Sequence, residues 1–198
     1  MTGQRARMGA LAVGATLLCG CASSITLSEL PVTKLTTSGG VRVALGRFEG
    51  DQCFQKTVAG YLAQPGGLQL TGEGQIADVT LSGHLRRIGV HSNLGDKAAA
   101  LSYFTAFIIT APIAAVMYGA KDWHADAAAE GQLTASNRAG ATAWTKEMTV
   151  SVSETQRTMP SDDAMKTAMS AAACQKLGTT LLNAFTEAVA ANPGLVRP

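Results

Sequence analysis

Strict alternation of side-chain type marks residues 123–135. Every second residue there is small or apolar, and polar residues fill the other positions except at Ala128. After a turn at residues 137–140, a second stretch alternates in the same way, with Trp144 and Val150 on its apolar side. A period of two is that of a β-strand, and one apolar side is typical of antiparallel strands with a single buried face. The chain is therefore expected to contain a sheet that needs cover on one face only.

Further strands are expected earlier in the chain. Residues 41–48 alternate, residues 68–70 form a short apolar stretch, and residues 79–90 alternate again. In the last of these, the apolar positions change phase at Arg86 and Arg87. One extra residue in a strand produces such a change, so a β-bulge is predicted there.

Two amphipathic helices are expected to cover the sheet. Residues 52–63 carry apolar side chains at helical spacing after Asp51, whose carboxylate suits the N-cap position. A longer helix is expected after Pro160, with acidic residues in its first turn, where the helix dipole favours them. Its apolar stripe consists of Met165, Met169, Ala173, Leu177, Leu181, Phe185 and Ala188. The expected class is α+β, with a mixed or antiparallel sheet of about five strands and two helices on one face.

The amino-terminal segment has the layout of an export signal. Arg5 and Arg7 precede an apolar stretch at residues 8–18, and a small residue comes before Cys21. The apolar stretch is shorter than the roughly 20 residues that span a bilayer as a helix. The tetrapeptide Leu18–Cys21 resembles the lipobox of bacterial lipoproteins, in which an aliphatic residue and two small ones precede the cysteine that becomes the mature amino terminus.

This resemblance implies a cellular location and a domain organisation. Residues 1–20 would be a signal peptide that is removed, and Cys21 would carry palmitate-type acyl chains, which anchor stably when two or more are present. Ala22 stands where lipoproteins of the inner membrane commonly carry Asp, so the resemblance implies the periplasmic face of the outer membrane. Residues 21–40, rich in Ser and Thr, are typical of a tether that reaches at most about 65 Å. The folded domain is expected at residues 41–198.

The charge balance excludes one class of partner. The 198 residues carry 16 basic and 14 acidic side chains, and two of the basic ones are Arg5 and Arg7 of the signal. The mature chain is therefore neutral, with no basic cluster. Nucleic-acid binding leaves an electrostatic footprint of that kind, so no nucleic-acid partner is expected.

Two of the 4 cysteines remain for the domain once Cys19 leaves with the signal and Cys21 is acylated. A pair of cysteines in an oxidising compartment favours one disulfide, here between Cys53 and Cys174. Such a bond would close a long loop and contribute on the order of 4 to 5 kcal/mol in the chain-entropy model. Two separate buried thiols are the alternative.

An uncharged apolar insertion occupies residues 98–120. As one helix it would be about 35 Å long, enough to cross a bilayer. A single crossing would however place the strands before and after it on opposite sides of the membrane, so they could not share a sheet. Pro112 interrupts any helix here, which predicts a helical hairpin that leaves the domain and returns.

The insertion supplies far more apolar area than a loop needs, and such exposed area marks a membrane or partner surface. The residues expected at a membrane or oligomer contact are Tyr103, Phe104, Phe107, Ile108, Ile109, Ile113, Val116 and Met117. The alternative is a hairpin that folds back and completes the core of its own domain.

The order of elements resembles periplasmic lipoproteins built on a TolB amino-terminal-like domain. These include the curli-secretion lipoproteins and the lipoprotein activators of penicillin-binding proteins. The likeness is carried by residues 41–45 (VRVAL), residues 77–83 (ADVTLSG) and Ala143-Trp144. The resemblance implies an envelope protein with this α+β fold, and it is a pattern of elements and not a catalytic motif.

Motifs of common enzyme classes are absent from the sequence. It has no nucleophile elbow, no phosphate-binding glycine loop and no zinc-binding His-Glu-x-x-His. His84 and His124 fall on polar strand faces, where solvated residues are the rule, although Asp126 lies close enough in sequence for a surface metal site to be considered. No enzymatic activity, cofactor or metal is expected.

The expected function is that of a non-catalytic accessory or binding module of the cell envelope. Its partners would be the membrane, through the acyl chains and the insertion, and an envelope protein or a second copy. The alternative is an oligomeric subunit of an envelope transport or secretion complex.

Overall fold

A computed structural model describes residues 40–72, 75–92, 123–156 and 162–196. Its elements, in chain order, are β1 (Val41–Glu49), α1 (Gln52–Leu62), β2 (Leu68–Leu70), β3 (Val79–Ser92), β4 (Trp123–Asn137), β5 (Thr142–Gln156), α4 (Asp162–Ala191) and a 3-10 turn (Pro193–Leu195). The predicted signal peptide, the tether with Cys21, and the apolar insertion lie outside the described residues.

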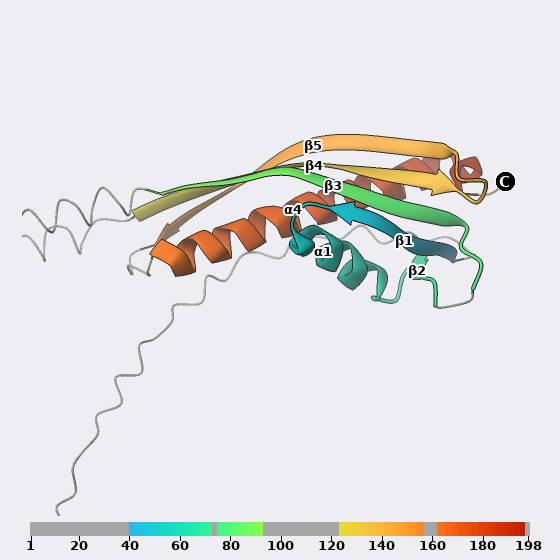
Figure 1. Cartoon of the computed structure of the whole chain (residues 1–198), viewed down its shortest axis with the longest axis horizontal. Coiled ribbons are helices and arrows are strands. Elements are labelled where there is room, and N and C mark those ends of the chain that lie inside the picture. Colours follow the sequence, from blue (N-terminus) through green and yellow to red (C-terminus); the bar gives the residue numbers. More distant parts are fainter. Residues whose placement is uncertain (1–39, 73–74, 93–122, 157–161, 197–198) are drawn as a thin grey trace, which may run out of the picture.

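The five strands form one mixed sheet in the order β2-β1-β3-β4-β5, and both helices lie on the same side of it (Figure 1). β1 runs parallel to β2 and β3, whereas β3, β4 and β5 are successively antiparallel. The α+β class predicted from the sequence is therefore confirmed.

The alternation of β4 explains how the helices cover the sheet. Its small residues Ala125, Ala127 and Ala129 are almost fully buried, and small side chains let α4 approach the strand closely. The two largest fully buried side chains are Phe54 of α1 and Phe185 of α4. The ring of Trp144 on β5 lies 5.3 Å from that of Phe185, so the core continues to the last strand.

Gly83 and Gly131 are required on the buried face for a steric reason. A Cβ on Gly83 would lie 2.5 Å from the ring of Phe48, and one on Gly131 would lie 2.8 Å from the side chain of Leu177. Each glycine therefore makes room for a large side chain that packs over the strand.

The start of α1 follows its predicted chemistry. Asp51 is the N-cap, and its carboxylate accepts a hydrogen bond of 2.8 Å from the backbone N–H of Cys53. The preceding Gly50 has a φ of 96°, a conformation that a residue without Cβ adopts at low cost. The tight link from β1 into the helix depends on this pair.

Two details of the strands and helices correct or extend the sequence expectations. The predicted bulge is present as a register shift between Leu85 and Arg87, but a second shift, between Leu45 and Phe48 of β1, was not predicted. The buried stripe of α4 ends at Val189, and Ala188 is only half-buried.

β3 and β4 also show how the apolar insertion joins the domain. Ser92 at the end of β3 is paired with Ala125 near the start of β4. Because these two strand ends are paired in one sheet, a single membrane crossing between them is incompatible with the sheet. Within the described residues, no helix has the length and apolar character needed to cross a membrane.

Candidate functional site

The side of the sheet opposite the helices carries polar residues on every long strand. This side is called the outer face here, and among the described residues no helix covers it (Figure 1). Its side chains are those that alternate with the core residues, including Thr80, Ser82, His84, Glu130, Gln132, Thr134, Thr145, Glu147 and Thr149. A broad hydrogen-bonding surface results.

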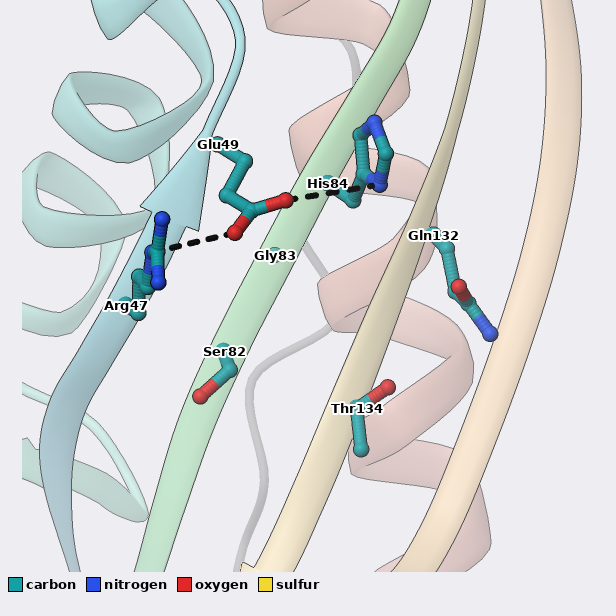
Figure 2. Close-up of a pocket in the computed structure, with 7 residues that line it drawn as sticks. All are labelled: Arg47, Glu49, Ser82, Gly83, His84, Gln132 and Thr134. Carbon is teal, nitrogen blue, oxygen red and sulfur yellow. Dashed lines mark ion pairs between the residues drawn. The ribbon is translucent and has the colours of Figure 1, made fainter.

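A shallow depression of about 210 Å³ lies on the outer face. Its lining residues come from β1, β3 and β4 (Figure 2): Arg47, Glu49, Ser82, Gly83, His84, Gln132 and Thr134. The Glu49 carboxylate lies between two basic groups, 3.0 Å from Nε of Arg47 and 3.9 Å from Nδ1 of His84. The unpredicted bulge in β1 matters here, because it changes the phase of the strand so that Phe48 enters the core while Glu49 joins His84.

A second ionic group crosses the outer face beside the depression. Arg86 forms ion pairs with Glu130 of β4, at 3.6 Å, and with Glu147 of β5. Arg86 follows His84 on the same face by strand alternation, at the register shift between Leu85 and Arg87. Further along, the hydroxyls of Thr134 and Thr145 are 2.6 Å apart, which continues the polar surface to the border of the sheet.

A third ionic group holds one end of the sheet together. The Asp78 carboxylate accepts hydrogen bonds from the backbone N–H and the guanidinium of Arg42 and from the guanidinium of Arg138. These bonds, chiefly the one from the Arg42 side chain, hold the pKa of Asp78 below its ordinary value, while partial burial opposes the shift. Asp78 thereby joins β1 to the turn between β4 and β5, which is a structural role.

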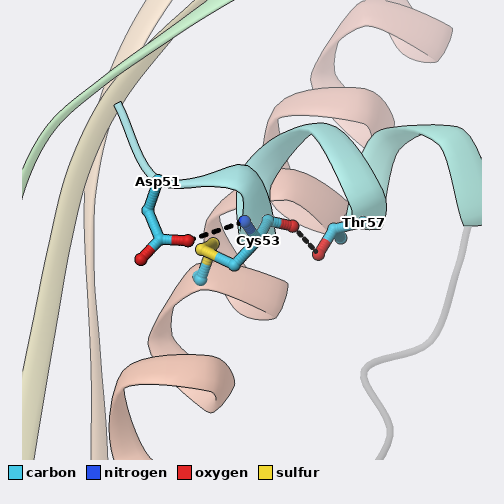
Figure 3. The surroundings of a disulfide bond; sticks show 4 residues. Asp51, Cys53 and Thr57 are labelled. Atoms are coloured by element: carbon cyan, nitrogen blue, oxygen red, sulfur yellow. Dashed lines mark hydrogen bonds between the residues drawn. A yellow bond between two sulfur atoms is a disulfide. The ribbon is translucent and has the colours of Figure 1, made fainter. Parts of the chain in front are cut away.

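The predicted site residues have different outcomes. The structure joins Cys53 and Cys174 in a disulfide with a Cα–Cα distance of 6.2 Å (Figure 3), so the alternative of two free thiols is not what it shows. Cys21 lies outside the described residues. So do all the residues predicted at a membrane or oligomer contact, from Tyr103 to Met117.

His84 and His124 are not brought together. His84 lies opposite Gln132, whereas His124, on the same strand as Gln132, lies eight positions earlier, or about 26 Å at the rise of a strand. In the part of the chain that the structure describes, no group of three His, Cys, Asp or Glu side chains is placed to hold a metal ion. The outer face therefore offers hydrogen bonds and paired charges as its chemistry.

No family model matches the sequence, and no curated protein matches it. Among solved structures, the fold is similar to a minor lipoprotein from Acinetobacter baumannii, with a TM-score of 0.43 and 7% identity over 74% of this chain and 93% of that one. It is also similar to a Xanthomonas campestris protein of the family DUF330, with a TM-score of 0.47 and 9% identity over 81% of this chain and 95% of that one. No function is carried over from either.

Proposed function

We propose that the protein is a lipid-anchored, non-catalytic binding module on the periplasmic face of the outer membrane. The observation that carries the binding role is the outer face, a polar sheet surface that the two helices leave open. The anchor is supported by the lipobox at Leu18–Cys21. The acyl chains hold the domain at the membrane, and the outer face contacts another envelope protein.

The dimensions of the outer face favour a protein partner over a small molecule. Pockets that bind small ligands enclose about 300 to 1,000 Å³ and bury most of the ligand. The depression beside His84 has only about 210 Å³, and it lies on an open sheet. A flat polar surface of this kind suits a protein–protein contact, in which paired charges give specificity more than affinity.

The ionic groups on the outer face support the same proposal. Arg86 lies between Glu130 and Glu147, and Glu49 lies between Arg47 and His84. Each cluster holds both signs of charge, so neither of them presents a single-sign field that would attract a nucleic acid or an acidic membrane surface. A partner with complementary polar groups would align on these clusters.

The apolar insertion, residues 98–120, would act as a second membrane contact. It leaves and rejoins the domain at adjacent strand ends, since Ser92 is paired with Ala125. Replacing the insertion by a short turn should leave a folded domain that is extracted from membranes more easily. Unfolding of this variant would show instead that the insertion completes the core.

The anchor is tested by metabolic labelling with radioactive palmitate. Wild-type protein should be labelled and should fractionate with outer membranes, whereas Cys21→Ala should be unlabelled. Labelling of the variant would refute the assignment of Cys21.

The docking surface is tested by photo-crosslinking in intact cells. A photoreactive amino acid at Gln132 or Thr134 should capture one defined envelope protein, because both side chains line the outer face. The matched control carries the same amino acid at Glu187, an exposed position of α4, and should not capture that protein. Equal capture at both places would refute docking through the outer face. Detergent-extracted rings with channel conductance would identify a secretion or transport subunit instead.

A further inference from the structure

β5 forms one border of the sheet. It is 15 residues long, and in the strand order β2-β1-β3-β4-β5 it has a neighbour only on the β4 side; Figure 1 shows it as the outermost strand. None of the other described segments pairs with its far edge. A long edge strand presents backbone N–H and C=O groups that act as a template for another strand.

Two contacts establish which residues of β5 present those groups. In an antiparallel ladder, residues alternate between bonding to the neighbour and pointing away from it, and side chains come closer in the pairs that do not bond. The hydroxyls of Thr134 and Thr145, 2.6 Å apart, are typical of such a close pair. Lys176 of α4 donates a hydrogen bond of 2.8 Å to the backbone carbonyl of Ser151. The odd-numbered residues of β5 therefore present their backbone groups to the free edge.

We propose that two copies of the protein pair through β5, antiparallel about a twofold axis at Val150. In this register Thr149 of one copy lies opposite Ser151 of the other, and these are residues whose backbone groups face outward. Each such pair exchanges two hydrogen bonds. The interface has closed twofold symmetry, because each copy contributes the same edge of β5. Once two copies have paired, that edge is occupied in both, and no third copy can add to it.

The side chains of β5 are self-complementary in this register. On the helix side, Met148 lies opposite Val152, and Lys146 lies opposite Glu154, so apolar meets apolar and opposite charges meet twice. Neighbouring registers lose this match. An axis at Thr149 places Lys146 against Val152, and an axis at Ser151 places Met148 against Glu154.

The contact between Lys176 and the Ser151 carbonyl is compatible with the pairing. A backbone carbonyl has two lone pairs, so Ser151 can accept from Lys176 and from the second copy together. The register pairs even-numbered residues with even-numbered ones, so the helices of both copies lie on the same side. The outer faces then form one continuous surface, and the pairing does not depend on the proposed anchor or partner.

A cysteine crosslink tests the register. The mature lipoprotein in detergent is oxidised after Val150→Cys, which places two identical residues opposite each other at a separation of about 5 Å between Cβ atoms. We expect a disulfide-linked dimer whose linking peptide contains position 150. The matched control is Ser153→Cys, whose two copies would be about 20 Å apart and should remain unlinked. Absence of the first crosslink, or equal formation of both, overturns the proposal.

Charge reversal tests the pairing with surface positions that leave the core intact. Lys146→Glu and Glu154→Lys should each weaken the dimer by about tenfold in sedimentation experiments, because like charges then oppose each other. The double reversal should regain the affinity, and Lys146→Arg serves as the charge-preserving control. Circular dichroism verifies that each variant is folded. A monomeric wild type, a larger ring, or single reversals without effect would refute the β5 dimer.

Discussion

Removing the bond between Cys53 and Cys174 should cost the domain a large part of its stability. The two cysteines are 121 residues apart in sequence. In the chain-entropy model, a crosslink that closes a loop of this length removes about 16 cal/mol/K of entropy from the unfolded chain, or about 5 kcal/mol at 25 °C. Domains of this size are stable by only about 5 to 15 kcal/mol. The reduced protein is therefore expected to be marginal.

The surroundings of the bond indicate that its native geometry is well supported. Asp51 caps the first turn of α1 at Cys53, and the hydroxyl of Thr57 donates a hydrogen bond of 2.9 Å to the carbonyl of Cys53 (Figure 3). On α4, Gly178 lies so near to α1 that a Cβ there would be 2.7 Å from the Thr57 side chain. The helices thus already approach closely, so the bond adds its constraint mainly to the unfolded chain.

The assay is urea unfolding of the mature protein in its oxidised and reduced forms, followed by circular dichroism. For a urea dependence of about 2 kcal/mol/M, a loss of about 5 kcal/mol lowers the midpoint by about 2.5 M. The double variant Cys53→Ser with Cys174→Ala should unfold near the reduced wild type. Mass mapping without reductant should find the two cysteine peptides linked.

The reasoning would be refuted by midpoints of the oxidised and reduced forms that agree within about 0.3 M, which is close to the error of such measurements. Free thiols at both positions in protein isolated from the envelope would refute the helix placement itself.

Two further substitutions test the packing and the ionic contacts. Gly83→Ala should destabilise the domain by about 2 kcal/mol through overpacking against Phe48, whereas Gly89→Ala on the same strand, where nothing lies within 4 Å, should be nearly neutral; equal thermal midpoints would refute the packing argument. Asp78→Asn should cost about 1 kcal/mol at pH 7, since its arginine partners are partly exposed. Because the folded-state pKa of Asp78 is lowered, this contribution is present above pH about 4 and is lost as the pH falls through that pKa, so an unchanged difference at pH 2 would contradict it.

Periodicity explains how much of the fold could be predicted from the sequence. In β4 and β5 the apolar residues recur with a period of two, and in α1 and α4 they recur at helical spacing. Both patterns follow from which side of the element is buried, and the side-chain types of neighbouring residues indicate that side. The bulge near Arg86 was predicted for the same reason, since the apolar positions of the strand change phase there. The bulge between Leu45 and Phe48 was missed although the apolar positions change phase there too, from Val43 and Leu45 to Phe48. Only one apolar residue follows that change before the strand ends, so the signal is shorter than the one near Arg86.

Much of the candidate site could be identified only from the folded structure. Glu49, His84 and Gln132 come from three strands, and no local pattern says which strands are neighbours or in which register they pair. The ion pairs of Arg86 with Glu130 and Glu147 depend on that register. The outer face was predicted as a polar surface, but its clusters were not.

The sequence by itself determined the strands, the helices and their buried sides, because each depends on residues near one another in the chain. Only the tertiary structure decided the strand order, the parallel pairing of β1, the position of β5 at the border and the contact of Cys53 with Cys174. These depend on side chains far apart in sequence meeting as the core forms. As a result, no other described element covers the outer face of the sheet or pairs with the far edge of β5.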